Sequence, residues 1–202
     1  MLFRSETVAE VQYKEQLQSA YKEQLARQRE AFERRISELE QTSHEIENML
    51  RQRGGSSEIL GTGQMVLPAQ GWISSPFGYR RHPIFHVVKF HSGVDIAAPR
   101  GRKIVAADSG RVVHAGWWSG YGQATIIDHG GGLTSVYAHQ SRIVVTPGQL
   151  VARGETIGYL GSTVNATGPH LHFEVRRNGS PTDPMNFLRG AQFGGSSQDS
   201  DD

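Results

Sequence analysis

Apolar side chains recur with two different spacings along the chain, one in its first quarter and another in the remainder. In residues 1–53 the spacing is seven, a period that predicts a long amphipathic helix with a coiled-coil-like face. Polar residues interrupt the second apolar position of this heptad, so the predicted coiled-coil tendency is moderate. The apolar repeat consists of Leu25, Phe32, Leu39 and Ile46.

After residue 64 the pattern changes to short apolar runs separated by Gly, Pro and Asn turns. Short runs with tight connections predict antiparallel pairing, and no helical segment is long enough to support parallel crossovers. The predicted fold is therefore mainly β: a compact antiparallel β-sheet domain with a groove, preceded by a long α-helix. The predicted strands are Lys103–Ala107, Arg111–Trp117, Gln123–Asp128, Leu133–His139, Ile143–Thr146, Thr156–Leu160 and His170–Arg176.

Composition divides the chain in the same way. Residues 1–53 contain neither proline nor glycine, whereas residues 64–189 contain all 8 prolines. Between them, the sequence GGSSE at residues 54–58 predicts a helix stop followed by a flexible linker over residues 54–63. The tail, residues 190–202, is predicted to be disordered because it is rich in Gly, Ser and Asp.

The histidines of the β-rich part carry the candidate chemistry. Side chains alternate across a strand, so His170, His172 and Glu174 share one face of the last predicted strand. If the segment HSGVDI is also extended, His91 and Asp95 share a face as well. Two imidazoles and one carboxylate, with a fourth position left for water, form the ligand set of a catalytic zinc site. A structural zinc site commonly uses cysteines, and this chain has none.

These residues resemble the lysostaphin-type (LytM-like) zinc metallopeptidases, which cut peptide bridges of bacterial peptidoglycan. The family pattern is His-x-x-x-Asp, a later lone His, and His-x-His, and here it is matched at His91–Asp95, His139 and His170–His172. The flanking sequences SPFGYRRHP and GSTVNATGPHLHFEV agree as well, so the resemblance covers about residues 64–189. No chemical position of the pattern is missing.

The resemblance implies a role for each of these residues. His91, Asp95 and His172 would be the zinc ligands, and His139 and His170 the catalytic histidines beside the metal-bound water and the substrate carbonyl. Imidazole titrates in a range useful for proton transfer, and the chain contains no HExxH motif with a glutamate base.

The other histidines have simpler interpretations. His82 and His86 lie close to His91 in sequence, but neither has a carboxylate four residues further on, so both are interpreted as rim residues of the groove. For Glu174 two interpretations remain open: a carboxylate that orients an imidazole, or a solvent-facing strand residue.

We therefore expect a zinc-dependent endopeptidase that hydrolyses peptide cross-links of peptidoglycan, with D-Ala–diaminopimelate links favoured as the scissile bond. The alternative is a non-catalytic regulatory module that binds cell wall and activates a partner hydrolase. For residues 1–53 the open alternatives are packing on the chain's own β domain, homodimerisation, and docking to a coiled-coil or division/envelope protein partner.

Charge and the start of the chain bear on partners and location. Residues 64–189 carry 12 Lys/Arg against 6 Asp/Glu, but these residues are scattered rather than clustered, which disfavours nucleic acid as a partner. The wall substrate implies an extracytoplasmic location, in the periplasm or cell envelope. The start MLFRSETVAE lacks the apolar core of a secretory signal, so we expect an export segment or membrane anchor upstream of Met1 in a longer protein.

Overall fold

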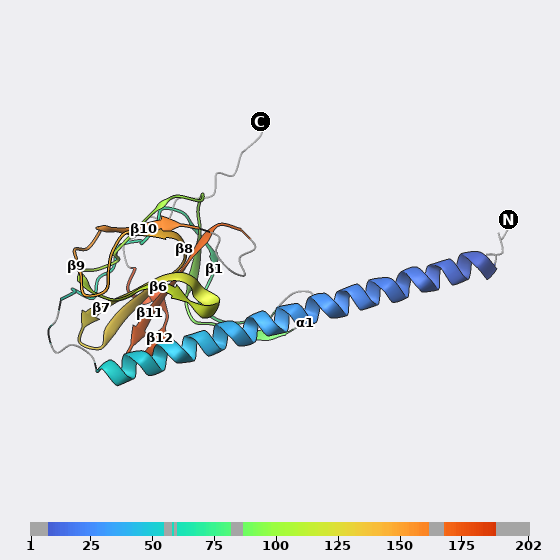
Figure 1. Cartoon of the computed structure of the whole chain (residues 1–202), viewed down its shortest axis with the longest axis horizontal. Coiled ribbons are helices and arrows are strands. Elements are labelled where there is room, and N and C mark those ends of the chain that lie inside the picture. The colour runs from blue at the N-terminus through green and yellow to red at the C-terminus, as the bar shows by residue number, and fades with distance from the viewer. Residues whose placement is uncertain (1–7, 55–57, 59, 82–86, 162–167, 189–202) are drawn as a thin grey trace, which may run out of the picture. The chain divides into compact units, whose positions relative to one another are not determined.

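The computed structural model describes residues 8–54, 58, 60–81, 87–161 and 168–188. The chain forms two compact units, Met1–Ser37 and Glu38–Asp202. Helix α1, Val8–Arg53, accounts for the described part of the first unit and opens the second (Figure 1). It ends at Arg53, and the positive φ of 65° at Gly54 suits the residue that follows a helix C-terminus. The boundaries predicted at residues 53 and 64 remain predictions.

Short antiparallel strands make up most of the regular structure of the second unit, which confirms the predicted fold class. Two short 3₁₀ turns, Ser119–Tyr121 and Pro184–Asn186, complete its regular structure. The strands are β1 (Trp72–Ser75), β2 (Gly78–Arg81), β3 (Val88–His91), β4 (Val94–Ala97), β5 (Lys103–Val105), β6 (Gly110–Trp118), β7 (Gly122–Gly130), β8 (Leu133–Ile143), β9 (Leu150–Val151), β10 (Thr156–Leu160), β11 (His170–Arg177) and β12 (Ser180–Thr182).

Ten of these strands form one sheet and the remaining pair, β2 and β3, forms a small second sheet. The order along the main sheet is β1-β4-β11-β8-β7-β6-β9, with β12 on β11 and the pair β10–β5 attached through β8. Strand β11 thus lies between β4 and β8, with His172 opposite both Asp95 and Ala138. This register determines where the candidate site forms.

The two faces of the main sheet are buried by different partners. On one face Leu171, Phe173 and Val175 are fully buried in the larger core, as the alternation predicted. On the other face Ile46 of α1 is fully buried in a cluster with Tyr121, Ala124, Ile126, Val136 and Ala138. The C-terminal third of α1, Glu38–Arg53, therefore packs on the β domain of its own unit.

Three sequence predictions were wrong in detail. Ile143–Thr146 is not a strand: Ile143 ends β8, and the chain then turns at Pro147–Gly148. HSGVDI is not continuously extended, because Ser92 and Gly93 form a bend between β3 and β4. The face of β11 opposite the core is not an open polar surface, because Glu174 on it is fully buried.

No helix within the described residues has the length and apolar character needed to cross a membrane.

Candidate metal centre

Strand pairing brings the candidate ligands together. Asp95 on β4 and His172 on β11 are direct neighbours across the sheet. His91 ends β3 of the small sheet and reaches the same point because the chain bends at Ser92 and Gly93. Gly93 passes so close to β11 that a Cβ there would collide with the backbone oxygen of Phe173. Glycine at this position is therefore a packing requirement for placing His91 and Asp95 side by side.

Three atoms of these residues converge on one point. His91 Nε2 lies 3.1 Å from Asp95 Oδ1 and 3.1 Å from His172 Nδ1, and His172 Nδ1 lies 2.9 Å from Asp95 Oδ1. Ligands about 2.0–2.1 Å from a tetrahedral ion stand roughly 3.3 Å apart, so this triangle needs only a small expansion to become a zinc coordination sphere. Within the described part of the chain this is the one group of His and acidic residues with metal-binding geometry.

The outward-facing nitrogens of both imidazoles are also engaged. His91 Nδ1 donates to the backbone oxygen of Pro76 at 2.8 Å, and His172 Nε2 donates to Glu174 Oε1 at 3.0 Å. These bonds leave the lone pairs of His91 Nε2 and His172 Nδ1 facing each other beside a carboxylate oxygen. Such an arrangement is repulsive without a cation between the atoms, and it is the outer-shell pattern that orients histidine ligands of zinc. The residues present therefore fit a zinc ion.

Without a metal, a proton takes the place of the cation. Burial lowers the pKa of His172, but hydrogen bonds to Asp95 and Glu174 outweigh it and raise this pKa to about 9. Burial raises the pKa of Asp95, yet its hydrogen bonds with His172 and His91 hold that pKa far below the usual range. The pKa of His91 is lowered by burial. In the metal-free centre the proton is therefore carried by His172, beside an ionised Asp95 and a neutral His91.

Two more histidines flank this triangle. The ring of His139 stands 4.9 Å from the ring of His170 and 6.2 Å from that of His172, measured between centroids. His170 Nδ1 donates to the backbone oxygen of Gly168 at 2.9 Å, which leaves its Nε2, 3.9 Å from Asp95 Oδ1, as an acceptor. His139 has a φ of 60°, a left-handed conformation that non-glycine residues seldom adopt and that is enriched at functional sites.

Two interpretations of Glu174 were open from the sequence, and Arg80 was not among the residues predicted for the site. Glu174 is fully buried and binds His172, which excludes the solvent-facing interpretation. Arg80 Nη2 lies 4.0 Å from Asp95 Oδ2, and Arg80 is paired with Lys89 across β2 and β3. The position of Arg80 in FGYR, shortly before the first ligand, was the available signal. His82 and His86 lie outside the described residues.

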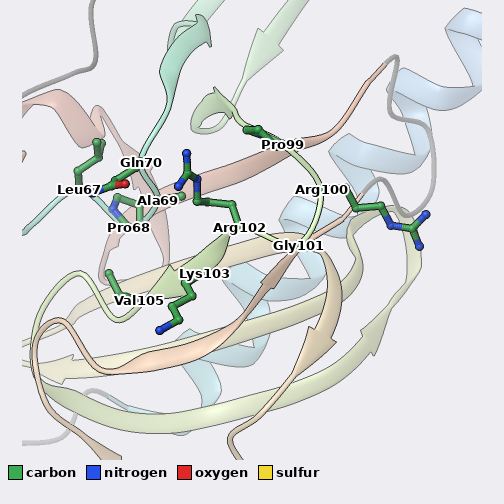
Figure 2. Close-up of a pocket in the computed structure, with 10 residues that line it drawn as sticks. All are labelled: Leu67, Pro68, Ala69, Gln70, Pro99, Arg100, Gly101, Arg102, Lys103 and Val105. Atoms are coloured by element: carbon green, nitrogen blue, oxygen red, sulfur yellow. The ribbon is translucent and has the colours of Figure 1, made fainter.

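A cavity of about 780 Å³ lies between the segments 67–70 and 99–105. Figure 2 shows the Arg102 side chain directed toward Gln70, whereas Arg100 points away from the 67–70 segment. None of the five candidate site residues lines this cavity. The chemistry therefore belongs to the histidine cluster rather than to the cavity.

An antiparallel sheet that carries a two-histidine, one-aspartate metal centre defines a class of zinc-dependent hydrolases. A family model described as peptidase family M23 matches residues 89–184, which include all five residues of the site, four histidines and one aspartate. With this match and the likeness to lysostaphin given below, the chain belongs to peptidase family M23. His91, Asp95 and His172 are the zinc site of that family, as expected.

Three similar proteins illustrate the relationship. The chain is 48% identical over 113 residues to the DD-carboxypeptidase/endopeptidase Mpg of Neisseria meningitidis, an alignment that covers 56% of this chain and 26% of that protein. It is 34% identical to a zinc-containing peptidase from Vibrio cholerae, with a TM-score of 0.57 and coverage of 67% and 41%. It is 33% identical to the catalytic domain of lysostaphin from Staphylococcus simulans, with a TM-score of 0.50 and coverage of 58% and 93%. The chain spans about a quarter of the length of the first curated relatives that it matches.

Proposed function

We propose that this chain is a zinc-dependent endopeptidase that hydrolyses peptide cross-links of bacterial peptidoglycan. The observation that carries the proposal is the convergence of His91 Nε2, Asp95 Oδ1 and His172 Nδ1, with both imidazoles oriented by outer hydrogen bonds. A zinc ion bound there would supply Lewis acidity, polarising the scissile carbonyl and lowering the pKa of water to about 7.

His170 is proposed as the residue that accepts a proton from the attacking water and passes it to the leaving amine. Its Nδ1–H is committed to Gly168, so Nε2 is the nitrogen that exchanges protons, and it faces Asp95 at the centre. His139, whose ring meets that of His170 edge to face, is proposed to stabilise the negative charge that develops on the carbonyl oxygen. Both histidines are buried or half-buried, so water competes little for their hydrogen bonds.

The scissile bond is proposed to be a D-Ala–diaminopimelate cross-link. Mpg, the Neisseria protein, is a DD-carboxypeptidase/endopeptidase, and ShyA of Vibrio cholerae, 40% identical over 114 residues, is a peptidoglycan DD-endopeptidase. A wall substrate requires an extracytoplasmic location, which we propose here together with an export or anchoring segment in the longer protein.

The first half of α1 is proposed to dock against another helix, either a second copy of this chain or an envelope protein. Between 41% and 74% of the surface of each of five apolar residues in this half is exposed, and a partner helix would bury this apolar surface. Sedimentation over a concentration series separates the two, because only self-association raises the mass. The five exposed apolar residues of this half are Val8, Val11, Tyr13, Leu17 and Tyr21.

The activity is tested by incubating the full zinc-loaded chain with purified cross-linked peptidoglycan and resolving the products by mass spectrometry. We expect release of uncrosslinked stem peptides, loss of release after chelation, and recovery on adding zinc. His172→Ala should be inactive, and His44→Ala, which changes an exposed histidine of α1, should match the unmodified protein. If the zinc-loaded protein releases nothing, the regulatory alternative replaces the enzyme.

A further inference from the structure

The carboxylate behind His172 belongs to a buried network that extends to helix α1. Glu174 Oε1 accepts hydrogen bonds from His172 Nε2 at 3.0 Å, from Ser92 Oγ at 2.5 Å and from the hydroxyl of Tyr121. Its Oε2 accepts from Arg176 Nε at 2.6 Å. The side chains of Glu174 and Arg176 are both fully buried, so this ion pair is held without water. Glu174 is therefore fixed from both of its oxygens.

Arg176 in turn is held by the helix. Its Nη1 donates to the backbone oxygen of Ser43 and to that of Gly179, each at 3.0 Å, and its Nη2 donates to Ser43 Oγ at 2.7 Å. Ser43 lies in the second half of α1, in the same compact unit as the zinc site. Figure 1 shows this end of α1 beside β11 and β12. Two side chains, Arg176 and Glu174, thus join a helix residue to a zinc ligand.

A second route connects the helix with the same carboxylate. Thr42 Oγ1, fully buried, accepts a hydrogen bond from the backbone nitrogen of Gly120 at 3.2 Å. Gly120 precedes Tyr121, whose hydroxyl binds Glu174. Trp118, three residues before Tyr121, packs on the same cluster as Ile46, and its Nε1 donates to Glu45 at 3.3 Å. The helix therefore contacts two partners of Glu174: directly the cation Arg176, and through Gly120 the neutral Tyr121.

The energetics make this network sensitive to the helix. Buried charged groups are tolerated when every donor and acceptor is paired, and removing one partner is strongly destabilising because it leaves a buried charge uncompensated. Without Ser43, Arg176 Nη2 would lose the partner that the structure gives it and Nη1 one of two. Arg176 would then shift toward other acceptors and release Glu174 Oε2. A shifted Glu174 reorients the His172 ring, because it holds the ring nitrogen opposite the metal-facing one.

We propose that the C-terminal third of α1, Glu38–Arg53, helps to position the metal ligands: Ser43 and Arg176 are positioning residues that act on His172 through Glu174. Docking of this helix segment sets the affinity and coordination geometry of the zinc site, and a partner that displaces it weakens metal binding. The proposal rests on the zinc site and not on the proposed peptidase activity, so the two can fail independently.

The test measures metal binding in the full chain. Zinc affinity of Ser43→Ala is determined by competition with a chromophoric chelator, and the visible spectrum of the cobalt-substituted protein reports ligand geometry. Loss of an outer-shell partner commonly costs 10–100-fold in affinity, and Ser43 acts two side chains away with its backbone bond retained, so we expect a loss of about 3–10-fold with altered cobalt bands. Ser43→Thr, which keeps a hydroxyl, should restore both.

Controls separate positioning from general stability. Ser37→Ala changes an exposed serine of the same helix and should bind zinc like the unmodified chain. Arg176→Lys keeps the charge but not the forked hydrogen bonds, and we expect a larger loss of affinity than for Ser43→Ala. If Ser43→Ala and Arg176→Lys lower the Tm of the metal-free protein but leave zinc affinity and the cobalt spectrum unchanged, the network is only structural and the proposal is wrong.

Discussion

His172 and Glu174 stand two residues apart on β11, and His172 Nε2 donates to Glu174 Oε1 at 3.0 Å while His172 Nδ1 faces Asp95 and His91. One imidazole thus spans from a fully buried carboxylate to the metal centre. The pair fixes both the orientation of the ring and the nitrogen that is available to zinc.

Replacing Glu174 with glutamine should weaken zinc binding. The amide lacks the negative charge that pairs with Arg176 and that makes the His172 ring a better ligand. We expect a loss of about 10–100-fold in zinc affinity, measured by chelator competition. Glu33→Gln, on the exposed face of α1, serves as the matched control. Equal affinities of the two variants would contradict the orienting role of Glu174.

The stability of the metal-free protein should fall on the alkaline side. The pKa of His172 is raised from 6.5 to about 9 in the folded state, so the folded protein holds a proton that the unfolded chain has released. The resulting stabilisation is complete below pH 6.5 and is lost as pH rises through 9, by about 3 kcal/mol in total. Urea unfolding at several pH values measures it. Zinc-loaded protein should lack this decline, since the ion replaces the proton; a metal-free protein equally stable at pH 6.5 and 9.5 would count against the raised pKa.

His170→Ala should abolish catalysis while retaining the metal. The imidazole does not belong to the ligand triangle, and its proposed task is proton transfer, which contributes about 10²–10⁴-fold to rate. Parallel measurements of zinc content and of peptidoglycan cleavage check both halves of this prediction. A variant with full zinc and unchanged rate would remove His170 from the mechanism.

Gly93→Ala should disturb the ligand triangle. The new Cβ collides with the backbone of Phe173 and approaches Cγ of Glu174 to 2.9 Å, so β4 must move away from β11. Overpacking of this kind costs roughly 1–3 kcal/mol of unfolding free energy, and here zinc affinity should fall as well. Gly168→Ala meets nothing within 4 Å and provides a comparison for stability. If Gly93→Ala keeps the stability and the zinc affinity of the unmodified protein, then Gly93 does not need to approach the backbone of β11 so closely.

Ile46→Ala should destabilise the β domain although the residue lies on α1. Ile46 is fully buried against the sheet, and truncating such a side chain leaves a cavity that lowers the unfolding free energy by about 2–5 kcal/mol. Leu17→Ala, whose residue is 52% exposed, should change the unfolding free energy by less than about 0.5 kcal/mol. Equal effects of the two substitutions would mean that the helix does not contribute to the core.

Local patterns predicted much of this structure. Strand β10 was predicted with its exact ends, and β11 to within one residue, because alternation and turn residues act over a few positions. The shared face of His170 and His172 followed from the same alternation. The bend at Ser92–Gly93 was missed because it depends on the close passage of β11, which lies about 80 residues away in sequence.

The network around Glu174 was beyond local patterns for a similar reason. Arg176 and Ser43 are separated by 133 residues, and no spacing rule connects a strand arginine with a helix serine. The alternation indicated that Glu174 faces away from the core, but only tertiary packing shows that helix α1 and Tyr121 cover that face. The roles of His139 and His170 remain predictions from the family resemblance.

The register of β4 against β11 also bears on how the chain folds. His91 and His172 are 81 residues apart, so the centre is incomplete until a large loop has closed and these two strands have paired. Long-range antiparallel pairing is slow compared with local turn formation. We therefore expect full-affinity metal capture to mark a late event in refolding, and a cobalt absorbance signal in a stopped-flow experiment to report the closing step of the domain.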